Sequence, residues 1–454
     1  MSSDSPHAHP HLHLQDNGDK DDRWNRDVRL LLAARFVRML AFGSSSLILA
    51  LFLSGLGQTP VQVGRFLTFT LIGDFLLSLV LTFVADSVLG RRNTLRIGAL
   101  SMLISGLVFA TISNTKILLV AAVLGVISPS GNEIGPFRAV EESILAELVE
   151  KQYRASLFGW YVVTGSLAAS LATWLGGWLN RVVEQDGDGG LMGYYRGVFV
   201  VYAVLGLVKL MLSLALSRRC ERTPIPAASG PVATSRTEPD ERDPLLPRSS
   251  SASASSSSSN PASAAREPIF GHGRFAGLCT LFSIDSLGSG MVSQTLQSWF
   301  LSRKFNADLS SLGSILSAAL FISSISNLFS ARLANRIGLV PTMILTHLPS
   351  SIILALTPLP NSLVATSAMI VARAATSSMD QAPRSAFLSA FVPAQHRTKV
   401  LGLVNTVKTL AQSGGPALTG WLTSQGRMGW AFHVAGAFKT TYDLGLLAAF
   451  STVS

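Results

Sequence analysis

Two carboxylic acids stand deep inside apolar stretches of the sequence, where an ionisable side chain is costly. Glu133 and Asp380 each lie about halfway along such a stretch, and a proline follows each acid three residues later, at Pro136 and Pro383. If both stretches are helices, a rise of about 1.5 Å per residue places the two acids at nearly the same depth. Acids at such a depth usually face a bundle interior or a watery cavity, where they can exchange protons. We therefore interpret Glu133 first and Asp380 second as proton-coupling residues, and the alternative for each is a static ion pair.

Basic residues that could pair with these acids follow them at short spacings. Arg384 lies four residues after Asp380, the favourable acid-first order for a helix, and Arg138 lies five residues after Glu133. Charged residues in other apolar stretches complete the candidates for proton coupling or solute binding: Asp285, Arg35, Arg38 and Arg373. The two arginines of the first stretch have an equally good alternative, because a long basic side chain can extend toward lipid head groups.

The composition of the chain is that of a membrane protein. Among its 454 residues 48% are hydrophobic and only 14% are charged, whereas soluble proteins carry about 25% charged residues. The apolar residues gather in blocks of about 20, the length that a helix needs to cross a bilayer. An ordinary cytosolic enzyme is therefore nearly excluded. The 36 lysines and arginines exceed the 26 acids, but they stand mostly between apolar blocks, which indicates cytoplasmic loops and not a nucleic-acid-binding surface.

The sequence predicts no cofactor and no metal. Two cysteines are too few for a disulfide framework or a cysteine-based zinc site. There is no phosphate-binding loop of the Gly-x-x-x-x-Gly-Lys-Ser/Thr type, which argues against an ATP-driven pump. Histidine pairs at helical spacing and Ser-His-Asp arrangements are also missing from the apolar blocks, so we do not expect an enzyme. The polar, histidine-rich leader before the first apolar block is not a signal peptide.

The apolar blocks predict twelve membrane-spanning helices. Their expected ranges are 29–56, 60–85, 93–113, 117–149, 153–180, 194–217, 270–302, 308–334, 338–359, 362–392, 397–424 and 430–450. An even number of spans places both chain termini on the same side of the membrane. Lysine and arginine are more frequent in the short loops of that side, and the long loop after the sixth span begins with Arg218, Arg219 and Arg222. We therefore place the termini and this loop in the cytosol.

Two segments without apolar periodicity divide the chain into domains. Residues 1–28 are predicted to be a disordered, histidine-containing tail, and residues 218–268 a disordered, Ser- and Pro-rich cytoplasmic linker. Between and after them lie two six-helix bundles, at 29–217 and 269–454. Within the linker, the segment Glu241–Leu246 resembles an acidic dileucine sorting signal. The expected location is therefore the plasma membrane or a vacuolar or lysosomal membrane.

The second half of the sequence repeats features of the first half at a nearly constant spacing. The residues Gly177-Trp178-Leu179 correspond to Gly420-Trp421-Leu422, each near the end of an apolar block. One block earlier, the pattern Glu133-x-x-Pro136 corresponds to Asp380-x-x-Pro383. Matches in the same order along the chain predict two similarly folded halves.

With these features the sequence resembles the Major Facilitator Superfamily over residues 29–450. The loop signature of the family, Gly-x-Leu-Ala-Asp-Arg-x-Gly-Arg-Arg, has two imperfect copies, at Ala85–Arg92 and Ala331–Gly338. The resemblance implies two six-helix bundles around a cavity near the membrane midplane, lined by the first, fourth, seventh and tenth spans. It also implies a cytoplasmic gate formed by the loop signatures and by acids at the end of the fourth span: Asp86, Gly90, Arg91, Arg92, Glu141, Glu142, Asn335, Arg336 and Gly338.

The fold expected from this resemblance is an all-α membrane protein with twelve transmembrane helices in two pseudo-symmetric bundles. The function that it implies is secondary active transport of a small organic solute by alternating access, with protons as the coupling ion. The expected partners are that solute, protons and the lipid bilayer, and the protein is expected to be a monomer. The alternative is a membrane sensor or scaffold that keeps the transporter fold without transporting. No local motif reveals the solute, because the shape of a cavity determines specificity.

Overall fold

The computed structural model describes residues 25–84, 89–125, 127, 136–185, 190–221, 272–391 and 397–450. Within these ranges the chain is nearly all α-helical and has no β-strand. Two predicted site residues, Glu133 and Asp86, lie outside the described residues, as do most of the predicted tail and linker. The chain divides into two compact units, Met1–Arg222 with Cys279–Ser454, and Thr223–Leu278. All contacts given below lie within the first unit.

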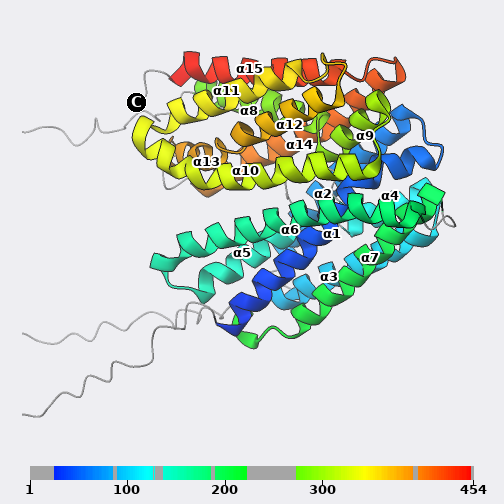
Figure 1. Cartoon of the computed structure of the whole chain (residues 1–454). Helices are drawn as coiled ribbons and strands as arrows, with labels where there is room; N and C mark the ends of the chain where they lie inside the picture. Colours follow the sequence, from blue (N-terminus) through cyan, green and yellow to red (C-terminus); the bar gives the residue numbers. More distant parts are fainter. Residues whose placement is uncertain are drawn as a thin grey trace, which may run out of the picture. The chain divides into compact units, whose positions relative to one another are not determined.

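The described helices follow the predicted order of apolar blocks (Figure 1). In the first half, residues 25–221, they are α1 (Arg26–Gly55), α2 (Pro60–Val84), α3 (Arg91–Thr111), α4 (Thr115–Leu124), α5 (Pro136–Leu148), α6 (Lys151–Gln185), α7 (Gly190–Leu214) and the short 3₁₀ helix η3 (Arg218–Cys220). In the second half, residues 272–450, they are α8 (His272–Met291), α9 (Gln294–Phe305), α10 (Leu309–Ile337), α11 (Leu339–Leu356), α12 (Leu363–Ser377), α13 (Gln381–Phe391), α14 (Arg397–Ser424) and α15 (Trp430–Phe450).

Several of these helices have the length and composition needed to cross a bilayer. Among the described residues seven qualify, and an eighth is obtained if the bent pair α8 and α9 counts as one span. Two further apolar helices, α4 and α12, are shorter. Large apolar side chains such as Val364 and Leu345 face outward, as a lipid environment requires. The prediction of an all-α membrane fold is confirmed, and the described spans are consistent with the predicted number of twelve.

The seventh and tenth predicted spans are each broken into two helices, the seventh into α8 and α9 with a bend of 45° and the tenth into α12 and α13. Gly125 is the C-cap residue of α4, and α5 is described from Pro136 onward, while most residues between them lie outside the described part of the chain. The assumption of continuous helices, from which the depth of Asp380 was calculated, is therefore wrong, because Asp380 lies at the break before α13.

The two halves pack against each other mainly through two helix pairs, α6 with α10 and α2 with α14, and also through α1 with α9. Figure 1 shows α6 beside α10. Glycines allow the close approach in the first two pairs. A Cβ atom added to Gly177 of α6 would lie 2.9 Å from the Cα atom of Gly313 in α10, and one added to Gly420 of α14 would lie 2.9 Å from the Cα atom of Gly64 in α2. Small residues at such crossings let membrane helices gain van der Waals contact.

Hydrogen bonds also join the halves. The Ser170 hydroxyl of α6 donates to the Ser317 carbonyl oxygen of α10 at 3.0 Å, and the Thr295 hydroxyl of α9 donates to the Ser46 carbonyl oxygen of α1 at 2.8 Å. The glycine contacts lie near Pro60, Leu309 and Ser424, at the helix ends opposite to the Arg218–Cys220 turn, and these hydrogen bonds lie further along the helices. The halves are therefore joined at this end, which we call the closed end.

An exposed ion pair adds to the closed end. The guanidinium of Arg181 lies 3.9 Å from the carboxylate of Asp308, the N-cap residue of α10. Burial tends to raise the pKa of the Asp308 carboxyl, but hydrogen bonds from Ser311 and the charge of Arg181 outweigh it and leave the pKa below its ordinary value. Asp308 is therefore ionised at neutral pH, as its cap and its partner require.

Candidate functional site

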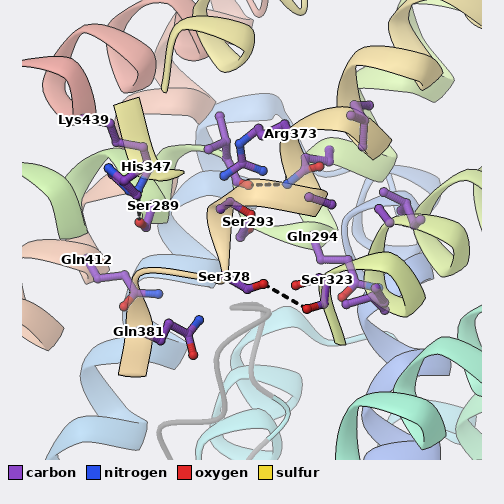
Figure 2. A pocket seen from close by; sticks show the side chains of 18 residues that line it. Ser289, Ser293, Gln294, Ser323, His347, Arg373, Ser378, Gln381, Gln412 and Lys439 are labelled. Atoms are coloured by element: carbon purple, nitrogen blue, oxygen red, sulfur yellow. Dashed lines mark hydrogen bonds between the residues drawn. The ribbon is translucent and has the colours of Figure 1, made fainter. Parts of the chain in front are cut away.

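A polar cavity of about 200 Å³ lies in the second half, where two broken spans meet (Figure 2). The break between α8 and α9 contributes Ser293, and the break between α12 and α13 contributes Ser378. Helices α10, α11, α14 and α15 complete the wall. Helix breaks free backbone groups that must be satisfied in other ways, so in membrane proteins they occur where they line a cavity. The local sequence thus builds a polar recess at the positions where the helices cannot continue.

Asp285 of α8 is the centre of a charge network beside this cavity. Lys439 of α15 donates to Oδ1 of Asp285 at 2.7 Å, and Arg384 of α13 donates to Oδ2 at 3.0 Å. Arg384 also contacts Asp380, so the expected pairing of these two residues is present. Asp285 and Asp380 are both almost fully buried. The structure therefore brings together three of the predicted site residues, Asp285, Asp380 and Arg384.

Three ionisable members of the network, His347, Lys439 and Asp443, were missed among the predicted site residues. His347 of α11 has Nδ1 at 2.8 Å from Oδ1 of Asp443 in α15, and its Nε2 lies 3.5 Å from Oδ1 of Asp285. The Ser351 hydroxyl donates to the other oxygen of Asp443 at 3.0 Å. His347 and Lys439 both border the cavity, and Figure 2 shows them close together on one side of it with Ser289. The sequence signal was the presence of ionisable groups in the ninth and twelfth apolar blocks.

Arg373 of α12 borders the cavity without an ion-pair partner among the described residues. No carboxylate of these residues lies within ion-pair distance of it, and its buried Nε has no hydrogen-bond acceptor there. Two other cavity residues have unsatisfied oxygens, the hydroxyl of Ser293 and the side-chain carbonyl of Gln294. Figure 2 shows Arg373, Ser293 and Gln294 around the same space. Buried polar groups in native proteins are usually paired, so these three side chains lack partners that they would normally have.

A second charge network lies in the first half. Arg38 of α1 donates to Oε2 of Glu141 in α5 at 2.5 Å, and the Tyr161 hydroxyl of α6 donates to the same oxygen at 2.7 Å. Lys209 of α7 lies 3.4 Å from Oε1 of Glu141. The guanidinium of Arg35 stacks on the Tyr161 ring at 4.2 Å from its centroid. The predicted solute-binding arginines, Arg35 and Arg38, are therefore brought together around an acid and do not extend toward lipid head groups.

The residues predicted as a gate are arranged in part as expected. Arg91 contacts an acid of the fourth span, but that acid is Glu147, at 2.7 Å. Glu141 is fully buried in the network around Arg38, so the predicted pairing of Glu141 with the loop arginines is not present. Glu142 pairs with Arg138 one turn away, at 2.6 Å.

The two copies of the loop signature each contain a glycine with a positive φ angle. Gly90 has φ of 75° and Gly338 has φ of 92°, a region that other residues adopt at a cost. The first turn of α3 is capped by Glu221, whose carboxylate accepts hydrogen bonds from the backbone N–H groups of Arg91 and Arg92. In the second copy, Asn335 and Arg336 are exposed.

Comparison with known proteins identifies relatives over nearly the whole chain. The model of the Major Facilitator Superfamily matches residues 31–283 and 278–450. The membrane protein YJR124C of Saccharomyces cerevisiae is 30% identical over 428 residues, which make up 94% of each chain.

Solved structures share the fold. A variant of the nucleoside transporter NupG superposes with a TM-score of 0.67 at 14% identity, covering 93% of this chain and 99% of that one. The D-xylose-proton symporter gives a TM-score of 0.66 at 14% identity, covering 92% of this chain and 96% of that one. At such identities the likeness is one of fold alone.

Proposed function

This chain belongs to the Major Facilitator Superfamily, and on that premise we propose that it is a secondary active transporter that carries a small organic solute by alternating access, coupled to protons. The observation that carries the proposal is the cavity of about 200 Å³ at the junction of two broken spans, with the Asp285 network beside it. Broken helices near the midplane are the usual place for a solute site in membrane transporters. A cavity bordered by buried charges is costly to maintain in a bilayer, and solute transport is a function that would use it.

The contacts between the halves support alternating access. Van der Waals contact and hydrogen bonds join the halves at the closed end, through α6 with α10 and α2 with α14. We call this contact between the halves at the closed end the seam. A rocking motion requires one such contact to form while another opens. The seam consists of small residues and few hydrogen bonds, so it can separate without leaving many buried polar groups unpaired.

We propose that protons are coupled to transport through Glu133 and Asp380. Glu133 is the first candidate from the sequence, and Asp380 is the one that the described residues include. Asp380 lies at the break before α13 and shares Arg384 with Asp285. A proton on Asp380 would remove its attraction for Arg384 and leave that arginine to Asp285 alone. Such a change in partners between α8 and α13 is a physical route by which protonation can alter the cavity wall.

The distribution of basic residues in the sequence supports a proposal for the arrangement in the cell. We propose that both chain termini and the linker lie in the cytosol and that the protein works as a monomer. The membrane is the plasma membrane or, if the dileucine-like segment acts as a sorting signal, a vacuolar or lysosomal membrane. Surface labelling of intact cells against permeabilised cells with an epitope at the C-terminus would test this topology.

The transport proposal is tested with the full chain in liposomes. We expect saturable counterflow of labelled solutes from a panel of sugars, nucleosides, amino acids and organic acids, and faster net uptake when the pH differs across the membrane. The Glu133→Gln and Asp380→Asn variants should retain counterflow but lose about tenfold in pH-driven accumulation, because exchange needs no net proton movement whereas accumulation does.

The outcome separates the proposed transporter from the alternative. A sensor or scaffold with the same fold would bind a solute, seen as a rise in the unfolding temperature, but would show no counterflow. If counterflow occurs and a pH difference has no effect on wild-type uptake, transport stands and the proton coupling is wrong. Liposomes with the Arg427→Gln variant provide the control, because Arg427 is exposed in the loop between α14 and α15.

A further inference from the structure

We infer that the solute carries a negatively charged group, of the carboxylate type, and that Arg373 and the N-terminal turn of α9 bind this group in the cavity of the second half. This inference rests on the proposed transport function and specifies the class of solute. It is carried by three features of the described cavity, namely a guanidinium without an ion-pair partner, buried acids that are already paired with other basic side chains, and a helix N-terminus with unsatisfied side chains.

The first feature is the guanidinium of Arg373. The other buried arginine of the second half, Arg384, contacts both Asp285 and Asp380, which shows how such a group is normally satisfied in this protein. Arg373 borders the cavity, and within the described part of the chain it has no ion-pair partner. Arginine presents a planar fork of donors that fits a carboxylate with two parallel hydrogen bonds. A cation held in a low-dielectric region needs such a counter-charge.

The second feature is the balance of charge around the cavity. The described helices of the second half bury three acids, Asp285, Asp380 and Asp443. Asp285 is paired with Lys439 and Arg384, Asp380 with Arg384, and Asp443 contacts His347. The three acids therefore already have basic neighbours among the described residues, and none of them forms an ion pair with Arg373 beside the cavity. A solute with one negative charge would give Arg373 a partner, whereas a neutral solute would not.

The third feature is the beginning of α9. The first N–H groups of a helix have no partner within the helix and carry the positive end of its dipole. Ser293, the N-cap residue of α9, makes no side-chain cap bond and is only 5% exposed, and its hydroxyl has no partner among the described residues. The Ser293 hydroxyl and the N-terminal turn thus supply further donors to an anion beside Arg373.

Gln294 restricts the solute further. Its side-chain NH₂ group donates to the Thr173 hydroxyl of the first half at 3.3 Å, and its carbonyl oxygen has no donor among the described residues. An acceptor in this position suits a hydroxyl, amino or amide N–H of the solute. Because Thr173 belongs to α6 and Gln294 to α9, a solute that binds here touches a residue of the contact between the halves. The expected solute therefore combines one anionic group with a hydrogen-bond donor.

The experiment compares acids with their neutral amides on the purified full chain. The probes are nicotinate with nicotinamide, salicylate with salicylamide, and lactate with lactamide, each titrated at pH 7 while the unfolding temperature is measured. We expect at least one acid to stabilise the wild-type protein at concentrations about tenfold below those of its amide. Arg373→Gln should abolish this preference, and Arg373→Lys should retain part of it, because lysine keeps the charge but loses the planar fork. Arg427→Gln should leave it unchanged.

Each result supports or overturns the inference. If the amides stabilise the wild-type protein as well as the acids do, the inference is wrong. Counterflow of neutral solutes in liposomes would in that case still support the transport function. If no acid stabilises the protein more than its amide, the inference is also wrong. If an acid binds through Arg373 but is not exchanged by liposomes, the anion site is supported and the transport function fails. The comparison of acid and amide on the wild type remains decisive if Arg373→Gln does not fold.

Discussion

At the residue scale, the first half depends on one buried acid. Glu141 has no exposure to solvent and is surrounded by the basic side chains of Arg38 and Lys209. Removing the acid of a buried ion pair leaves cations without compensation, and such losses cost about 3 to 5 kcal/mol. We therefore expect Glu141→Gln to lower the free energy of unfolding by about this amount, seen as reduced thermal stability in detergent.

The neighbouring acid Glu142 provides the matched control for Glu141. Its pair with Arg138 is about one-third exposed on both sides, so Glu142→Gln should cost no more than about 1 kcal/mol. Combining Glu141→Gln with Lys209→Met should recover part of the lost stability, because one uncompensated buried charge is then removed. Equal stability of the Glu141 and Glu142 variants would show that the buried network contributes little.

The charged residues of the two networks could be found in the sequence, but their partners could not. An ionisable residue within an apolar block is conspicuous, and for this reason Asp285, Asp380 and Arg38 were among the candidates. The contact of Asp285 with Lys439 joins residues 154 positions apart, and no local pattern indicates it. Only the pairing of Asp380 with Arg384, which lies within one helical turn, was predictable from spacing.

At the element scale, the positions of the helices were predictable and their breaks only in part. Prolines after Glu133 and Asp380 indicated distortion of the fourth and tenth spans. The break between α8 and α9 has no proline, and it comes instead after a Gly-Ser-Gly sequence at Gly288–Gly290 and before Ser293. Such small residues also occur in unbroken membrane helices, so the pattern alone does not separate a bend from a packing site.

The crossing of α2 and α14 depends on two glycines, which leads to a prediction at this scale. A Cβ atom at Gly420 would lie 2.5 Å from the Pro60 carbonyl oxygen, so Gly420→Ala must push the two helices apart. We expect the seam at the closed end to loosen. A cysteine at Thr68, whose hydroxyl accepts from the Ala417 N–H in the same seam, should then react several-fold faster with a water-soluble maleimide.

The same helix supplies the control for this prediction. Gly402 lies in α14, and a Cβ atom added there would meet no other atom within 4 Å, so Gly402→Ala should leave the reaction of the cysteine unchanged. Both variants are made in a background in which the free cysteines Cys220 and Cys279 are replaced by serine. Equal rates in the Gly420 and Gly402 variants would mean that the glycine contact does not hold the seam.

At the scale of the whole molecule, transport by alternating access requires the closed end to open in each cycle. The two halves meet there through α6 and α10, where the hydroxyl oxygens of Ser170 and Ser317 are 3.0 Å apart. Sulfur atoms in place of these oxygens would need to approach to about 2.05 Å to form a disulfide, a shift of about 1 Å that side-chain rotation can supply. A bond at this position would fix the closed end without touching the cavity, because neither serine lines it.

We therefore expect the double variant Ser170→Cys with Ser317→Cys, made without Cys220 and Cys279, to lose counterflow when it is oxidised and to regain it when a reductant is added. Loss should approach completeness, because a single covalent link prevents the halves from separating in every cycle. Each single cysteine variant should be insensitive to the oxidant, which separates the effect of the link from that of the substitutions. Formation of the disulfide is checked by a shift in gel mobility after cleavage in the linker. If the oxidised double variant contains the disulfide and still exchanges solute at the wild-type rate, the halves do not separate at this end. The rocking motion proposed for the molecule would then be wrong.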